Sequence, residues 1–321
     1  MSEASVPRIT VVTPSLNQCT FIERTLRSVL DQAYPNLEYI VIDGGSSDGT
    51  VDVLRAYEPR LAAWVSEPDS GQADAINKGF RLSTGEILAF LNADDLYAPG
   101  ALARVAADFA EGDGREWHAY PVQDFEGGST LHRPPGLSRK LGDVPVEDRD
   151  RLANRLALWV MGRIGLHQPG VFWRRRHWLE AGGLDPRYHY AFDRHFFMKL
   201  VAAGYPLVSH PEPAVGLFRL HPGSKTVRNL RGVDNPFVRE RLEIEDEFEA
   251  LLPRAERRTV GRSRTDDAIS SAWKMFREDA PRGDCLAWLA RLAASRTSAL
   301  GSRYFWGTAL RFLTAGRPSR A

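Results

Sequence analysis

The sequence predicts an α/β protein with a mixed, mostly parallel sheet that is flanked by helices. Over the first hundred residues, short apolar runs alternate with segments whose apolar residues recur at helical spacing. This alternation is typical of βα units with right-handed crossovers. The strand-like runs are continuously apolar, as in strands buried on both faces of a parallel sheet. Each run ends in a polar or acidic cluster, and the carboxyl ends of parallel strands bring such clusters to one edge.

Four strands and four helices are expected in this first part of the chain. The strands are predicted at Ile9–Thr13, Tyr39–Ile42, Ala62–Val65 and Ile87–Leu91. Thr20 and Glu23 have the spacing of a capping box and are predicted to open the first helix. The second helix is expected after Thr50, the third at Gln72–Leu82 and the fourth at Tyr97–Phe109.

The second part of the chain is less regular. Residues 126–146 carry Gly, Pro and charge without periodicity, which predicts a long loop. A run of three arginines at residues 174–176 indicates either phosphate binding or the solvated start of a helix. Helices are expected within residues 152–164 and 188–200, and strands at Trp117–Val122, Pro206–Ser209 and Val215–Leu220.

Composition excludes several classes of protein. The formal net charge of +1 gives no reason to expect nucleic acid as a partner. Only Cys19 and Cys285 are present, which argues against a disulfide scaffold and fits a reducing compartment. Residues 1–7 lack the features of a secretory signal, and no apolar stretch approaches the ~20 residues of a membrane-spanning helix. We expect a soluble, cytoplasmic protein.

A change of composition after residue 227 predicts two domains. Residues 1–227 are expected to form the first domain, with one half at 1–110 and the other at 111–227. Residues 228–321 are expected to form an α-helical appendix, with charged helices at Arg239–Arg258 and Asp266–Glu278. Its aromatic end at Tyr304–Leu313 indicates packing on the first domain, a homodimer contact, or peripheral contact with the inner face of a membrane.

Two adjacent carboxylates, Asp94 and Asp95, follow the fourth predicted strand. Side by side they repel each other, so a cation or a set of hydrogen-bond donors is needed to keep both ionised. The alternative is a structural role, in which one of them caps the helix expected from Tyr97. Acidic residues also follow the second and third strands, at Asp43 and Asp69, and this joint placement favours a ligand site.

The loop at Gly44–Thr50 has the Gly and Ser content of a phosphate cradle. It matches neither the P-loop pattern nor the dinucleotide fingerprint. This disfavours an NTPase or a dehydrogenase, and it favours a nucleotide whose diphosphate is neutralised by a divalent cation.

Five motifs in order resemble those of family 2 glycosyltransferases, which are inverting enzymes with the Rossmann-like GT-A fold. They are Thr13–Asn17, Ser28–Gln32, Val41–Thr50, Ser66–Gly79 and Leu91–Asp95. The resemblance implies a nucleotide-diphosphate-sugar donor, with Thr13, Asp43 and Asp69 at base and ribose. The residues implied to bind the nucleotide sugar are Thr13, Pro14, Ser15, Asn17, Asp43, Ser46, Asp69, Gln72, Asn77, Lys78, Asn92, Ala93, Asp94 and Lys225.

The resemblance also implies a divalent cation, Mn²⁺ or Mg²⁺, held by Asp95, Asp94 and His221. Asp95 is the first choice of ligand, and Asp94 is expected to serve the ribose as well. The family motif often reads Asp-x-Asp, whereas Asn92 occupies its first position here. An amide oxygen brings no charge to a metal, so Asn92 leaves strict metal dependence open. Lys225 is in reach of phosphate in this reading.

Asp193 resembles the acid that begins the acceptor-side helix and acts as catalytic base in this family. A carboxylate there would take the proton from the attacking hydroxyl, and a helix N-terminus would stabilise its ionised form. The alternative is a simple N-cap. Many relatives carry a second acid two positions later, where this chain has His195. That exchange is expected to alter acceptor contacts and removes one negative charge.

The predicted activity is therefore metal-assisted, inverting transfer of a sugar to an acceptor hydroxyl. The resemblance implies that residues 1–227 are the catalytic domain, with a nucleotide-sugar half at 1–110 and an acceptor half at 111–227. The acceptor is a sugar, a lipid-linked molecule or a small molecule, in glycan, glycolipid or natural-product biosynthesis. One rival is a sugar-phosphate nucleotidyltransferase, which needs a basic Gly-rich loop after the first strand, and residues 13–18 do not supply one. The other rival is a catalytically silent nucleotide-sugar-binding module, which Asn92 and His195 leave open.

Overall fold

The computed structural model describes residues 6–126, 129–131, 154–225 and 236–277, together with residues 283, 286, 287, 289, 290, 306 and 310. The chain divides into two compact units. The first unit comprises Met1–Arg155 and Ile164–His221, and the second comprises Leu156–Arg163 and Pro222–Ala321. The long loop expected at residues 126–146 lies mostly outside the described residues, as do Cys285 and most of the expected aromatic end.

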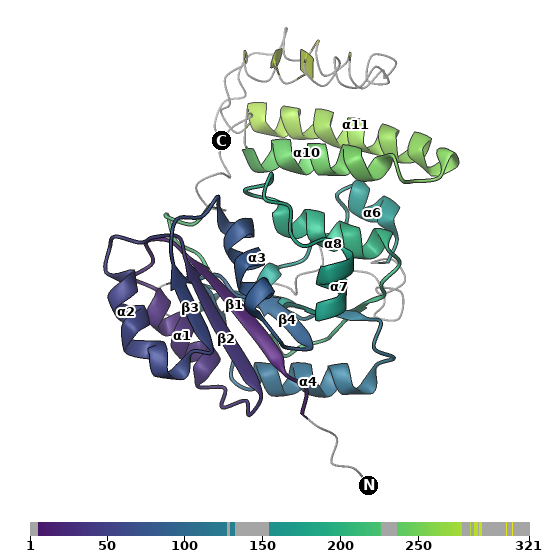
Figure 1. Ribbon diagram of the computed structural model, residues 1–321. Coiled ribbons are helices and arrows are strands. Elements are labelled where there is room, and N and C mark those ends of the chain that lie inside the picture. Colours follow the sequence, from purple (N-terminus) through teal and green to yellow (C-terminus); the bar gives the residue numbers. More distant parts are fainter. Residues whose placement is uncertain are drawn as a thin grey trace. The chain divides into compact units, whose positions relative to one another are not determined.

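A seven-stranded sheet forms the centre of the first unit, in the order β10-β6-β9-β4-β1-β2-β3 (Figure 1). Neighbouring strands are parallel except at β9, which runs antiparallel to β4 and β6. The strands are β1 (Ile9–Ser15), β2 (Leu37–Asp43), β3 (Ala63–Ser66), β4 (Ile87–Phe90), β6 (Trp117–Ala119), β9 (Val171–Arg174) and β10 (Leu207–Ser209). The predicted mostly parallel α/β architecture is confirmed.

Helices cover both faces of this sheet, as the continuous apolar runs require. They are α1 (Ile22–Leu30), α2 (Thr50–Tyr57), η1 (Glu58–Arg60), α3 (Gln72–Leu82), α4 (Ala101–Glu111), η2 (Gln168–Gly170), α7 (Arg175–Glu180) and α8 (Phe192–Ala202). Val11, Val41 and Ala89 pack in one core cluster with α1, α2 and α4. The alternate residues face α3, α7 and α8, where Trp173 contacts Phe80, Phe90 and Phe196.

Helix α3 approaches β1 closely because it carries Gly79. A Cβ at this position would lie 2.5 Å from a methyl carbon of Val12, well inside van der Waals contact. Any larger residue would push the helix away from the sheet. The close approach keeps the N-terminus of α3 near the carboxyl end of β1.

A second, four-stranded sheet has the order β5-β11-β7-β8. Its strands are β5 (Leu96–Tyr97), β7 (Val122–Glu126), β8 (Ser129–Leu131) and β11 (Gly216–Arg219). β5 follows the acid pair directly and pairs antiparallel with β11 through Tyr97 and Gly216. This pairing brings the end of β11 to the acid pair.

The second unit is helical in its described part. It contains α6 (Leu156–Val160), α10 (Pro236–Glu249) and α11 (Arg254–Arg277). Arg264 of α11 is buried and forms ion pairs with Glu245, Asp246 and Glu249 of α10. No described helix is long and apolar enough to cross a bilayer.

Two expected helix starts are wrong. The capping box does not form, because α1 begins at Ile22 with Phe21 as N-cap and no side-chain cap bond. Glu23 instead pairs with Arg27 and accepts a hydrogen bond from Tyr57. The fourth helix begins at Ala101 and not at Tyr97, because β5 pairs with β11 and Gly100 turns the chain with a φ of 77°.

The three arginines at residues 174–176 hold the first unit together. Arg174 pairs with Glu86, Arg175 donates to the backbone oxygen of Ser83, and Arg176 donates to that of Gly114. β9 runs antiparallel to β4, so these side chains follow its end at the edge opposite the acid pair. These contacts, and the start of α7 at Arg175, favour the interpretation of the three arginines as the start of a helix over phosphate binding.

Candidate functional site

The carboxyl ends of β1 to β4 meet at one edge of the main sheet. Their register pairs Ser15 with Asp43 and Asp43 with Ser66. The acid pair follows β4 at the same edge, since β4 is parallel to β1. The topology therefore brings together the polar residues that the sequence placed after each strand, including Thr13 and Pro14 within β1.

Asp43 is fully buried and organises the loop that follows β2. Its carboxylate accepts hydrogen bonds from the backbone N–H groups of Gly45 and Ser46, at 3.1 and 2.8 Å. It also accepts from the hydroxyls of Ser46 and Ser66. These four bonds satisfy the charge of Asp43 within the protein and fix the shape of the loop.

Asn17 joins the loops after β1 and β2. It adopts a left-handed backbone conformation with a φ of 52°. Its N–H donates to the hydroxyl of Ser46, and its side-chain oxygen accepts from the N–H of Ser47. Asn tolerates this conformation better than most residues, so its presence here has a structural reason beside any contact with a ligand.

The loop after β3 carries Asp69 and leads into α3. One Asp69 oxygen accepts from the N–H of Gly71, and the other faces Gly44, where a Cβ would lie 2.8 Å from it. Gly44 thus leaves room for this carboxylate between two loops. His189 lies against the opposite side of the same loop, 3.1 Å from a Cβ built at Gly71.

Two of the predicted ligand residues have structural partners. The amide of Asn77 is buried, bonds both the N–H and the C=O of Leu184, and accepts from the indole of Trp178. Lys78 forms an ion pair with Glu67 at 2.9 Å. Both side chains therefore hold neighbouring loops in place.

The turn at residues 92–95, which follows β4 and carries the acid pair, is called the acid turn below. Asp94 and His221 meet at its partly exposed side. The His221 Nε2 lies 2.9 Å from the Asp94 Oδ2. The imidazole packs against the ring of Phe21, with centroids 4.6 Å apart. A carboxylate and an imidazole at this distance can share a proton or a cation.

Asp95 points the other way, into the protein, where it is 1% exposed. Its Oδ1 accepts from the N–H of Arg219 at 2.9 Å, and its Oδ2 accepts from the amide of Asn92 at 3.1 Å. Burial, and then the charge of Asp94, raises the pKa of Asp95. Asp95 therefore links the acid turn to β11 through buried hydrogen bonds.

Asn92 completes this arrangement from the first position of the motif. Its side-chain oxygen accepts from the amide of Gln72 at 2.6 Å, while its NH₂ group donates to Asp95. An ionised aspartate at this position could not donate to Asp95. The hydrogen-bond chain from α3 to β11 thus uses both ends of the amide.

Three side chains that the sequence analysis missed fix the acid turn. The hydroxyl of Thr25 reaches the backbone oxygens of Ala93 and Asp95, at 2.8 and 2.9 Å. Gln168 donates to the backbone oxygen of Phe90 at the end of β4. Arg219 donates to the backbone oxygen of Asp94 at 2.7 Å. Of the three, only Arg219 lies beside a predicted site residue, two positions before His221.

Asp193 lies in the first turn of α8, after the N-cap residue Ala191. It is therefore not the N-cap, and the same holds for Asp94 and Asp95, because Gly100 is the N-cap of α4. Phe192 packs against Phe90, with ring centroids 5.9 Å apart. This contact holds the start of α8 at the carboxyl end of β4.

His195 does not contribute to the surface of the site. It is 1% exposed and packs against the ring of Tyr188, with centroids 4.9 Å apart. The expectation that it alters acceptor contacts is therefore not supported. Lys225 belongs to the second unit, and its role stays a prediction.

The donor set at the acid turn fits a divalent cation that is shared with a substrate. No three His, Cys, Asp or Glu side chains among the described residues are grouped to hold a metal alone. Mg²⁺ in nucleotide sites is usually held by one or two carboxylates together with substrate phosphates. Asp94 and His221 can supply the protein side of such a site.

Comparisons with known proteins point to one family of enzymes. Residues 10–140 match the family described as "Glycosyl transferase family 2". An uncharacterized glycosyltransferase of Mycobacterium tuberculosis is 32% identical over 204 residues, which are 63% of this chain and 72% of the relative. A PGL/p-HBAD biosynthesis glycosyltransferase of Mycobacterium bovis is 37% identical over 111 residues, which are 33% of this chain and 43% of the relative.

Solved structures share the fold. Residues 1–349 of TarS from S. aureus, in complex with UDP-GlcNAc, match with a TM-score of 0.66 at 16% identity, covering 95% of this chain and 89% of that one. The mannosyltransferase PcManGT from Pyrobaculum calidifontis, in complex with GDP-Man and Mn²⁺, matches with a TM-score of 0.52 at 21% identity, covering 97% and 88%.

Proposed function

The chain belongs to glycosyl transferase family 2, and we propose that it is an inverting enzyme that uses a nucleoside-diphosphate sugar and a divalent cation. The observation that carries this proposal is the contact between Asp94 and His221 at the carboxyl edge of the sheet. The two fold relatives were solved with UDP-GlcNAc and with GDP-Man and Mn²⁺. A nucleotide sugar at the corresponding edge of this sheet would bring its diphosphate to the acid turn.

Asp94 and His221 are proposed as the protein ligands of the cation. This ranks Asp94 above Asp95, which was the first choice from the sequence. Asp95 is buried and already bonded to Arg219 and Asn92, so its proposed role is to hold the turn. A bound divalent cation would offset the negative charge that grows on the departing diphosphate.

Asp193 is proposed as the catalytic base. It would take the proton of the acceptor hydroxyl, whose oxygen attacks the anomeric carbon from the face opposite the diphosphate. Its place in the first turn of α8 favours the ionised carboxylate, because a helix N-terminus stabilises negative charge. One displacement of this kind inverts the anomeric configuration.

The nucleoside is proposed to lie along the loops after β1, β2 and β3. Asp69 is partly exposed beside Gly44 and remains available to a base or ribose. Asp43 already accepts three hydrogen bonds from its own loop and one from Ser66 at the end of β3, so its proposed contribution is to shape the pocket for the base.

The test begins with turnover of candidate nucleotide sugars by the full chain in the presence of Mn²⁺. Asp193→Asn should abolish transfer while leaving donor binding within twofold, and full activity in this variant would refute the base assignment.

Asp94→Asn should weaken Mn²⁺ activation at least tenfold, and EDTA should have little further effect on it. Activity that survives EDTA in the unmodified protein would refute the cation. The ¹H coupling constant of the product's anomeric proton reports inversion or retention.

A further inference from the structure

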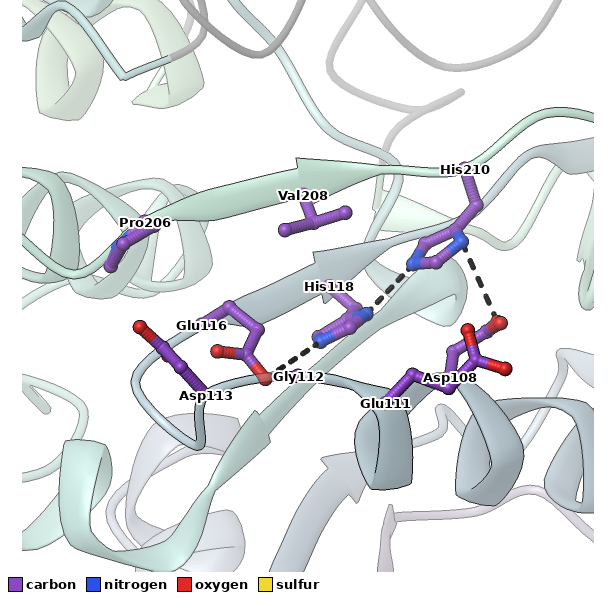
Figure 2. Close-up of a pocket in the computed structure, with 9 residues that line it drawn as sticks. All are labelled: Asp108, Glu111, Gly112, Asp113, Glu116, His118, Pro206, Val208 and His210. Carbon is purple, nitrogen blue, oxygen red and sulfur yellow. Dashed lines mark hydrogen bonds and ion pairs between the residues drawn. The ribbon is translucent and has the colours of Figure 1, made fainter.

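A cavity of about 380 Å³ lies on the first unit between the C-terminal end of α4 and strands β6 and β10 (Figure 2). β10 is the edge strand at the opposite end of the sheet from β3. The cavity is therefore separate from the loops after β1, β2 and β3. Its volume is within the range of small-molecule sites, ~300–1,000 Å³.

The polar side chains that line the cavity are carboxylates and imidazoles. They are Asp108, Glu111, Asp113, Glu116, His118 and His210. No lysine or arginine is among the lining residues. Guanidinium groups instead approach two of these carboxylates. Arg104 Nε lies 3.8 Å from Asp108 Oδ2, and Arg174 Nη2 lies 3.7 Å from Glu116 Oε1. Both arginines approach the same oxygens that lie near the histidines, Asp108 Oδ2 and Glu116 Oε1. Four carboxylates still line the cavity.

The two histidines form an ordered chain that begins at Asp108, as Figure 2 shows. His210 Nδ1 lies 3.5 Å from Asp108 Oδ2, and His210 Nε2 lies 2.7 Å from His118 Nδ1. The carboxylate favours a proton on His210 Nδ1, so His210 Nε2 accepts from His118 Nδ1–H. His118 Nε2 then carries a lone pair.

This lone pair has no donor among the described residues. His118 is 2% exposed, and its Nε2 makes no hydrogen bond there. The nearest carboxylate oxygen, Oε1 of Glu116, is 3.9 Å away, too far for a direct hydrogen bond. Burial lowers the pKa of His118 to about 3, so the ring stays neutral. A buried acceptor without a donor is costly, and a ligand with N–H groups would remove that cost.

The chemistry of the wall selects the ligand. Carboxylates repel an anion, and the described residues offer no group of three side chains placed to hold a metal ion. Pro206 and Val208 add an apolar side to the cavity, which suits an aliphatic stem. We propose that this cavity binds a primary ammonium group, which donates hydrogen bonds to Glu116 and to His118 Nε2.

Binding of putrescine to the full chain, followed by calorimetry and by ¹⁵N NMR of the histidine rings, tests the proposal. Putrescine should bind, and the Nε2 resonance of His118 should shift as it accepts a hydrogen bond. Tetramethylammonium carries the same charge without N–H groups, so it should bind at least tenfold more weakly. Equal binding of the two cations, or an unchanged His118 resonance at saturating putrescine, would overturn the proposal, as would Mn²⁺ displacing putrescine.

Two variants locate the site. Glu116→Gln should weaken putrescine at least tenfold, and Glu111→Gln, at an exposed position, should weaken it severalfold even if the buried variant fails to fold. Glu58→Gln, an exposed acid on η1, is the matched control and should bind as the unmodified protein does. Equal loss in the control would refute a local site. Nα-acetyl-lysine amide carries the same ammonium on a peptide unit, and its affinity relative to putrescine separates a lysine side chain from a free polyamine as the source.

Discussion

Replacing Asn92 by aspartate would restore the Asp-x-Asp pattern of the family, and the structure predicts that the protein becomes less stable. The Asn92 NH₂ group donates to Asp95 Oδ2 at 3.1 Å. In Asn92→Asp, two carboxylates would face each other at that distance. With an effective dielectric constant of ~20, two unit charges 3.1 Å apart repel by about 5 kcal/mol. This value is an upper limit, because the pair can take up a proton instead.

Proton uptake gives this prediction its pH dependence. The added aspartate would have a raised pKa in the folded protein and an ordinary pKa of ~3.9 when unfolded. The cost of Asn92→Asp is therefore small below about pH 4, grows as the pH rises through the interval between the two pKa values, and is constant above the folded pKa. We expect about 2–4 kcal/mol at pH 8 and less than half of that at pH 5.

Urea unfolding at a series of pH values measures this cost. Asn92→Ala is the control, because it also removes the donation to Asp95 and adds no charge; unlike aspartate, it removes the acceptor of the Gln72 amide as well. The difference between the two variants isolates the repulsion from Asp95. If Asn92→Asp and Asn92→Ala have parallel stability curves from pH 5 to pH 8, the 92 and 95 side chains are not neighbours and the geometry of the acid turn is refuted. Mn²⁺ should reduce the difference if the cation binds at this turn.

Three further predictions concern residues that support the site. Thr25→Val keeps the shape of the side chain and removes its buried hydroxyl, so it should cost about 1–3 kcal/mol and weaken Mn²⁺ activation, whereas Thr25→Ser should retain activation. Asn77→Leu leaves three buried partners without their bonds and should cost about 2–4 kcal/mol in urea unfolding. A donor KM that is unchanged in the folded variant would show that Asn77 does not bind the nucleotide sugar. Burial lowers the pKa of His177 to about 4 in the folded protein, whereas an unfolded histidine has a pKa of ~6.5. As the pH drops from ~6.5 toward 4, His177 therefore takes up a proton in the unfolded chain but not in the folded one, and the free energy of unfolding should fall. His177→Phe should reduce this slope, and an unchanged slope would contradict a buried neutral imidazole.

Most strands and helices of the first hundred residues could be predicted because burial imposes their apolar patterns. The short strand β5, which was expected to be helical, is an exception. Helix α3 has the predicted bounds, Gln72–Leu82, and β4 ends one residue before its predicted end. The helix starts were less predictable, because several chain segments compete for the same groups. Thr20 and Glu23 have capping-box spacing, yet Glu23 finds partners in Arg27 and in Tyr57 of α2. Spacing along the chain does not reveal a partner such as Tyr57, which lies 34 residues after Glu23.

The same limit applies to Asn77, which belongs to a family motif. Its amide bonds Leu184, which lies 107 residues later. Gly183 has a φ of 74°, and a Cβ there would lie 2.9 Å from the Asn77 oxygen. The motif residue and the Gly-Gly turn therefore form one buried contact between α3 and the segment before α8. A motif identifies which residues matter, but not whether they contact the ligand or the protein.

The acid turn shows why adjacent residues of one motif can differ in role. Asp94 and Asp95 are the same residue type one position apart, and nothing local distinguishes their charges. The distinction comes from β11, since the N–H of Arg219, 124 residues away, bonds the carboxylate of Asp95. His221, two residues beyond the end of this strand, meets Asp94. Because β5 and β11 pair directly after the turn, one carboxylate is drawn into the protein while the other stays partly exposed beside an imidazole. The pairing of two short strands thus decides which acid can reach a substrate. A variant that disrupts this pairing should impair Mn²⁺ activation through Asp94 even though it leaves both aspartates in the chain.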